Sequence, residues 1–144
     1  MADLVDKVNA ELENISAVLT ELNKIANKPA KSLVELAGVG TFLHNIYNGI
    51  ENILKQILGA KGVSAPKMSE SWHRDLLALS LENGIISKDT QKRLADYLAF
   101  RHFFSHSYSF LLDEVYLKPL VDNIPQVYTV FKKEIENWLS KTKR

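Results

Sequence analysis

The sequence predicts an all-α protein, an antiparallel bundle of four to five helices. Apolar residues recur at steps of three and four along almost the whole chain, which places them on one face of each helix. The 144 residues contain only six glycines and four prolines, and no stretch of useful length shows the alternation typical of a β-strand. The segments between the periodic regions are short, as is usual for antiparallel neighbours in a bundle.

Length and composition predict one globular domain over residues 1–144. Single domains usually contain about 100–150 residues, and 46% hydrophobic with 24% charged residues is ordinary for a soluble domain. The formal net charge of +1 gives no long-range attraction to a partner. The acidic, amphipathic N-terminus is unlike a signal peptide, and the longest nearly apolar stretch, residues 33–43, is too short to cross a bilayer. We expect a cytoplasmic protein without membrane contact.

The first two periodic segments predict two long helices. The first begins at Leu4 and ends at Lys28-Pro29, since proline stops a helix and suits the first turn of the next one. The second runs from Leu36 to Ile57, followed by a loop from Gly59 to Pro66. The apolar stripe of the first segment is Leu4, Val8, Leu12, Ile15, Leu19, Leu22 and Ala26, and small residues that allow close helix approach in the second are Gly38, Gly40 and Gly49.

The third and fourth helices are predicted from their caps as well as their periodicity. The third runs from near Ser69 to Leu81 and ends at Asn83-Gly84, because glycine favours the left-handed conformation that follows a helix. Ser87 is the expected N-cap of the fourth helix, which covers Lys88 to about Ser105.

A fifth segment, Leu111–Leu139, is also apolar at helical spacing. It contains Pro119 and Pro125, which remove backbone donors from a helix, so we expect them to kink or divide it.

Several classes of chemistry are excluded by the sequence. The chain has no cysteine, which excludes disulfides, thiolate metal sites and a cysteine nucleophile. It contains no HExxH motif, no phosphate-binding glycine loop and no nucleophile elbow. The four histidines, His44, His73, His102 and His106, are not joined by carboxylates at metal-ligand spacing. We therefore expect neither a metal nor a cofactor.

One segment does concentrate reactive side chains, the sequence FRHFFSHSY at residues 100–108. The guanidinium of Arg101 offers fixed donors for phosphate oxygens, and an imidazole moves protons near neutral pH. The neighbouring aromatic rings are surfaces on which unpaired bases stack. RNA supplies its own nucleophile, the 2′-hydroxyl, so these groups favour cleavage of RNA without a metal.

Helical geometry constrains how these residues act together. Arg101 and His106 are five residues apart, which on a continuous helix is about 140° of rotation. Either the helix ends between them or two copies of the segment meet across a symmetric dimer. Arg101 and Tyr108 are seven residues apart and lie nearly in line.

Each candidate also has a structural interpretation. Arg101 is then a surface or ion-paired arginine, and His106 is a helix-end or hydrogen-bonded residue. The phenylalanines of the segment are then residues of the core or of the dimer contact. His73, beside Trp72, is interpreted as structural although near the site. Glu51 is interpreted as solvated or paired with Lys55, and for His44 the sequence indicates no partner.

The segment reads Arg-x4-His-x-Tyr near the end of a helix, and this resembles the HEPN superfamily, whose ribonucleases contain Arg-x(4–6)-His. The form with the tyrosine is similar to the HepT-type toxins. The motif is followed by LLDEVYL and preceded by a SWHRDLL helix, and the helical pattern from Leu4 to Leu139 fits the bundle of that family. Ser105 stands where many relatives have a basic residue.

The resemblance implies a metal-independent endoribonuclease that acts as a homodimer, with transfer RNA among its targets and a 2′,3′-cyclic phosphate as product. It assigns phosphate binding and charge stabilisation to Arg101 and general acid or base catalysis to His106. His102 and Ser105 are expected to support these residues or to contact RNA.

The resemblance also implies a protein partner. HepT-type toxins are paired with a minimal nucleotidyltransferase antitoxin, MntA, in a type VII-like HEPN/MNT toxin–antitoxin system. That partner transfers AMP to the motif tyrosine, which corresponds to Tyr108. Two other functions stay open: a non-catalytic HEPN module that binds a nucleotidyltransferase or a nucleotide, and a plain helical interaction module in which the motif is coincidental.

Overall fold

The computed structural model describes residues 2–63, 71–106 and 113–142, and every regular element in these ranges is an α-helix. The predicted all-α fold is confirmed. The helices are α1 (Ala2–Ala26), α2 (Leu33–Ala60), α3 (Trp72–Glu82), α4 (Lys88–His106) and α5 (Glu114–Thr142).

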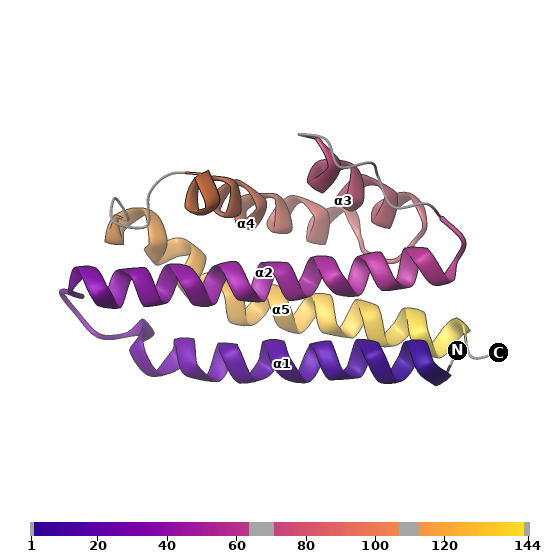
Figure 1. Cartoon of the computed structure of the whole chain (residues 1–144), viewed down its shortest axis with the longest axis horizontal. Helices are drawn as coiled ribbons and strands as arrows, with labels where there is room; N and C mark the ends of the chain where they lie inside the picture. The colour runs from indigo at the N-terminus through magenta and orange to yellow at the C-terminus, as the bar shows by residue number, and fades with distance from the viewer. Residues whose placement is uncertain (1, 64–70, 107–112, 143–144) are drawn as a thin grey trace.

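Four of the helices, α1, α2, α4 and α5, lie lengthwise beside one another, and the short α3 lies near the end of α2 and the start of α4 (Figure 1). α2 runs antiparallel to both α1 and α4, as expected for a bundle with short connections (Figure 1). α2 contacts each of the other four helices. α2 is therefore the helix around which the other four are arranged.

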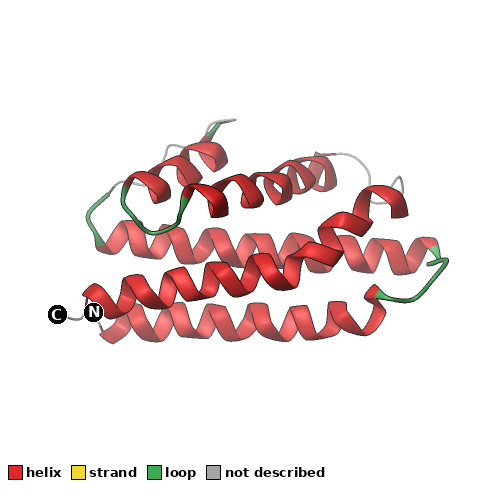
Figure 2. Cartoon of the chain, turned by 180° about the vertical axis from the view of Figure 1, so that it is seen from behind, coloured by secondary structure: helices red, strands yellow, loops and turns green. Residues whose placement is uncertain are grey.

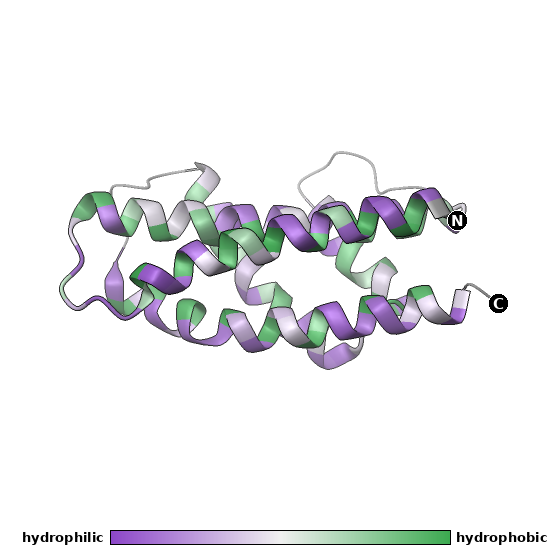
Figure 3. Ribbon diagram, turned by 90° about the horizontal axis from the view of Figure 1, so that it is seen from below, coloured by the Kyte–Doolittle hydropathy of each residue, from purple (hydrophilic) through white to green (hydrophobic). Residues whose placement is uncertain are grey.

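The core is formed by the apolar stripes that the periodicity predicts, and Figure 3 shows hydrophobic and hydrophilic residues alternating along each helix. Tyr47, Phe100 and Phe131 are its largest fully buried side chains and come from α2, α4 and α5. In α1, Leu19 and Ala26 are only partly buried, whereas the rest of the predicted stripe is buried. Burial of these apolar surfaces is the main force that holds the bundle together.

The start of α2 is fixed by a capping box. Ser32 Oγ accepts from the backbone N–H of Glu35 at 3.1 Å, and Glu35 Oε1 accepts from the N–H of Ser32 at 2.8 Å. Hydrogen bonds from Lys28 and then from the Ser32 backbone lower the pKa of Glu35 to about 2. The prediction that Pro29 opens this helix is wrong, because α2 begins at Leu33 and its first turn is capped by the side chain of Ser32.

The other helix ends follow their predicted signals more closely. Gly84 adopts a φ of +72° directly after α3, which is the conformation glycine was expected to supply. The N–H of Thr90 donates to Ser87 Oγ at 3.1 Å, so Ser87 caps α4 as predicted. Glu134 of α5 accepts from both the N–H and the hydroxyl of Ser87, at 3.0 and 2.9 Å, which joins the cap to the neighbouring helix.

Neither Pro119 nor Pro125 divides the fifth segment, since both lie inside the single helix α5. Figure 2 shows α5 changing direction in the half of the helix that contains these prolines. The alternative that they kink the helix is therefore correct, and packing of the apolar face of α5 compensates for the lost backbone bonds.

Of the small positions predicted for close packing, Gly49 has that role. A methyl group at Gly49 would lie 2.7 Å from Cγ1 of Ile15 on α1, a buried side chain. The prediction for Gly38 is wrong, because a methyl group there would meet no other described atom within 4 Å. Gly49 therefore allows α1 to approach α2 closely, near the middle of both helices.

We predict that Gly49→Ala lowers the free energy of unfolding by about 1–3 kcal/mol, the usual cost of overpacking a core. The matched control is Gly38→Ala in the same helix, which should leave stability unchanged or raise it by about 0.5–1 kcal/mol, since alanine restricts the unfolded chain more than glycine does. Urea unfolding of both variants measures the difference. Equal effects of the two substitutions would contradict the assigned packing.

Candidate functional site

Arg101 is held against α2 by a hydrogen bond. Its Nε–H donates to Oδ1 of Asn48 at 3.0 Å, and both side chains are partly buried. The position follows from the helix period, because Leu94 and Tyr97, seven and four residues before Arg101, are buried on the side of α4 that packs inward. This bond uses one of the five N–H donors of the guanidinium. The other four belong to the terminal nitrogens, which form bidentate hydrogen bonds with phosphate.

The length of α4 determines how far apart Arg101 and His106 lie around the helix axis. The helix continues from Lys88 through His106, so it does not end between the two residues. On this continuous helix they are about 140° apart. Of the two arrangements expected from the sequence, the one in which the helix ends between Arg101 and His106 is therefore wrong.

The remaining motif residues lie at or beyond the end of α4. His102 and Ser105 are exposed on the helix. Tyr108 lies outside the described residues, and of His106 only the helical backbone is described. Phe100 is 1% exposed and stacks on Phe104 with ring centroids 5.5 Å apart, so these rings pack in the bundle as their structural interpretation predicted.

His44 lies close to Arg101 and contacts Phe104, a neighbour that the sequence did not indicate. Its ring meets the ring of Phe104 edge-on, with centroids 5.3 Å apart. Its Nε2 is buried and has no hydrogen-bond partner among the described residues. Burial, followed by the positive charge of Arg101, lowers the pKa of His44, while the carboxylate of Glu51 acts in the opposite direction. These causes favour a neutral imidazole beside the guanidinium.

The interpretation of Glu51 as solvated or paired with Lys55 is wrong. Glu51 is only 2% exposed, and its Oε2 lies 2.7 Å from Nδ1 of His73 on α3. Lys55 instead lies over the ring of Trp72, with Nζ 4.2 Å from the centroid. The sequence missed this pair because the two residues are 22 positions apart and belong to different helices.

These contacts share one origin, a polar row on α2 composed of His44, Asn48, Glu51 and Lys55. The steps of four, three and four place the four residues on one side of the helix, one turn after another. The row meets Phe104 and Arg101 of α4 and then His73 and Trp72 of α3. The steps of four, three and four between these polar residues were the sequence signal for the row, although Asn45, Asn52 and Gln56 of the same helix are polar as well.

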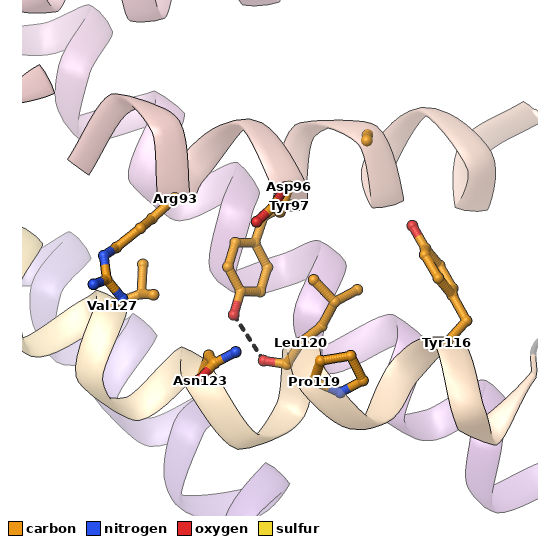
Figure 4. A pocket seen from close by; sticks show the side chains of 9 residues that line it. Arg93, Asp96, Tyr97, Tyr116, Pro119, Leu120, Asn123 and Val127 are labelled. Atoms are coloured by element: carbon orange, nitrogen blue, oxygen red, sulfur yellow. Dashed lines mark hydrogen bonds between the residues drawn. The ribbon is translucent and has the colours of Figure 1, made fainter. Parts of the chain in front are cut away.

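A cavity of about 340 Å³ lies between α4 and α5, and its described lining does not include the polar row (Figure 4). The hydroxyl of Tyr97 donates to the carbonyl of Leu120 there at 2.7 Å. Arg93, also on its rim, is engaged with Asp89 at 2.9 Å. Tyr97 therefore joins α4 to α5 in this cavity, whereas Arg93 is paired within α4, and Arg101 is not part of the described lining.

Within residues 2–63, 71–106 and 113–142, no three histidine, aspartate or glutamate side chains form a group that could hold a metal ion. No helix in the same ranges is both long and apolar enough to span a membrane.

An all-helical bundle and the sequence Arg-x4-His-x-Tyr at residues 101–108 are both typical of HEPN-like proteins. Residues 38–142 match the family model described as HepT-like protein, from within α2 to the last residue of α5. Because this match covers most of the chain, the protein belongs to the HepT-like family. No curated protein matches the chain.

Proposed function

We propose that this protein is a metal-independent endoribonuclease, the toxin of a HEPN/MNT toxin–antitoxin pair. The observation that supports this proposal best is the hydrogen bond that fixes Nε of Arg101 on Asn48, inside the region matched by the HepT-like family. A guanidinium held at Nε presents its two terminal nitrogens in a fixed plane, which suits a phosphate with two free oxygens.

In the proposed reaction the 2′-hydroxyl of the RNA attacks the adjacent phosphorus. Arg101 binds the scissile phosphate and stabilises the charge that develops on its oxygens. His106 transfers a proton as general acid or base. His102 and Ser105, exposed beside them on α4, support this pair or contact the RNA. The products are a 2′,3′-cyclic phosphate and a 5′-hydroxyl, and transfer RNA in the cytoplasm is the proposed substrate.

The proposed enzyme is a homodimer. Since α4 is continuous through His106, the 140° between Arg101 and His106 separates them within one chain. A two-fold axis near the ends of two α4 helices brings Arg101 of each chain toward His106 of the other. The two motifs then line one composite cleft between the chains.

The proposed antitoxin is an MntA-type minimal nucleotidyltransferase that transfers AMP to Tyr108. The tyrosine is two residues after His106, so an AMP group on its hydroxyl adds bulk and negative charge next to the motif. This charge competes with the RNA phosphate for the guanidinium of Arg101. Neutralisation therefore requires no unfolding of the toxin.

We predict that the wild-type protein cleaves total cellular RNA in the presence of EDTA, and that Arg101→Ala and His106→Ala reduce the rate at least about 100-fold. The control is Arg93→Ala on the same helix, whose guanidinium pairs with exposed Asp89 and should leave cleavage unchanged. Gel analysis of 5′-labelled RNA measures the rates, and size-exclusion chromatography verifies the dimer.

Two results would contradict this prediction. Cleavage that disappears in EDTA and returns with magnesium would exclude the metal-independent mechanism. An unmodified, dimeric wild-type protein that cleaves no RNA would favour the alternative of a non-catalytic module that binds a nucleotidyltransferase or a nucleotide.

We predict that Tyr108→Phe cleaves RNA like the wild type but escapes inactivation by the nucleotidyltransferase and ATP, because phenylalanine lacks the acceptor hydroxyl. Intact-mass spectrometry should show AMP adducts on the wild type alone. Tyr116→Phe, which removes a hydroxyl from an exposed tyrosine of α5, is the matched control and should be modified like the wild type. Adducts on Tyr108→Phe at the wild-type level would disprove the assignment.

A further inference from the structure

The pair formed by Glu51 and His73 has the construction of a proton-transfer dyad. A carboxylate that is 2% exposed is costly unless it is paired and hydrogen-bonded, and here Oε2 of Glu51 lies 2.7 Å from Nδ1 of His73. With Nδ1 engaged, the imidazole has Nε2 as its remaining nitrogen. The side chain of His73 is 16% exposed, so the dyad extends from the interior to the surface.

The ring of His73 is also held in place by its neighbours. The Trp72 ring lies against it, with centroids 3.8 Å apart and planes inclined by 34°. Lys55 reaches over the same indole from α2, with Nζ 4.2 Å from the centroid. A hydrogen bond at one edge and an aromatic ring against one side fix the orientation of the imidazole, as a base oriented by a third group requires.

The dyad and Arg101 are neighbours on the polar row of α2. Asn48, which holds Arg101, and Glu51, which holds His73, are three residues apart, or about 4.5 Å along the helix axis. Residues at this spacing share one face. The charges of Arg101 and Glu51 both act on Tyr47 and on His44, which places the two charged groups around the same part of α2.

We propose that His73, oriented by Glu51, is the general base of the ribonuclease, an assignment that rests on the function proposed above. Nε2 of His73 takes the proton from the 2′-hydroxyl while the bond between O2′ and phosphorus forms. The bond between phosphorus and O5′ breaks, and His106 supplies the proton that O5′ needs. Glu51 stabilises the imidazolium formed on His73, as buried carboxylates do in other dyads. Exchange with water then returns both imidazoles to their starting forms.

His73→Asn separates this role from a structural one. The amide nitrogen of asparagine replaces Nδ1, so a donor remains for buried Glu51, but Nε2 is lost. Glu51→Gln is the second variant, since it keeps an acceptor for Nδ1 and leaves no charge in the interior. Asp75→Asn, at an exposed carboxylate of α3 bonded to Ser71, is the matched control for the change of charge. Melting temperature and dimer content are measured for all variants.

The substrate is a synthetic RNA that spans the position the wild type cleaves in total RNA, made with either oxygen or sulfur as the 5′-leaving atom. A sulfur leaving group departs without protonation. We expect His73→Asn to lower kcat at least about 100-fold on both substrates, with KM changed less than about threefold. We also expect that the kcat of His73→Asn no longer rises with pH over the range in which the kcat of the wild type does. Glu51→Gln should lower kcat about tenfold or more, and Asp75→Asn should have no effect.

The other outcomes overturn either the proposed function or the assignment of His73. A wild type that cleaves neither substrate overturns the proposed function and this assignment with it. An active wild type with His73→Asn within threefold of its kcat overturns the assignment alone. If the kcat of His73→Asn returns to the wild-type value on the sulfur substrate, His73 is the general acid. If His73→Asn raises KM on both substrates and leaves the pH profile of kcat unchanged, His73 is an RNA contact. Either result excludes His73 as the general base.

Discussion

The polar row of α2, His44, Asn48, Glu51 and Lys55, requires partners from the neighbouring helices and so determines how α3 and α4 pack on α2. The row lies on a helix that contacts all four of its neighbours. Glu51 is buried and the other three residues are partly buried, and such polar groups destabilise a core unless they find partners. α4 supplies Arg101 to Asn48, and α3 supplies His73 to Glu51. The alignment of α2, α3 and α4 is therefore specified by hydrogen bonds as well as by apolar packing.

The opposite side of α2 provides the rigidity that such a row needs. There Gly49 allows α1 to approach until Ile15 fills the space that a side chain would occupy. At the start of α4, Ser87 and Glu134 connect the cap of that helix to α5. Both helices that carry the candidate site are thus supported from the side away from it, so the reactive groups are positioned by helices and not by loops.

The sequence predicted the features that depend on local periodicity and failed where partners come from distant segments. Apolar steps of three and four located all five helices, and Ser87 and Gly84 marked two of their ends. Pro119 and Pro125 were compatible with one helix because tertiary packing outweighs the loss of two backbone bonds. The motif drew attention to Arg101, but Asn48 and the burial of Glu51 depend on contacts between helices, which no local pattern encodes.

In the proposed enzyme, Asn48 holds Arg101 in the orientation that acts on the RNA phosphate. The most direct measurement is kcat/KM for RNA cleavage by Asn48→Ala and Asn48→Asp, with melting temperature as the check on folding. A hydrogen bond to a charged group contributes about 1.5–3 kcal/mol, so Asn48→Ala should lower kcat/KM about tenfold or more. Asn48→Asp, which keeps an acceptor for the Nε–H of Arg101, should lower kcat/KM less than Asn48→Ala does. Cleavage by Asn48→Ala at the wild-type rate would contradict the claim.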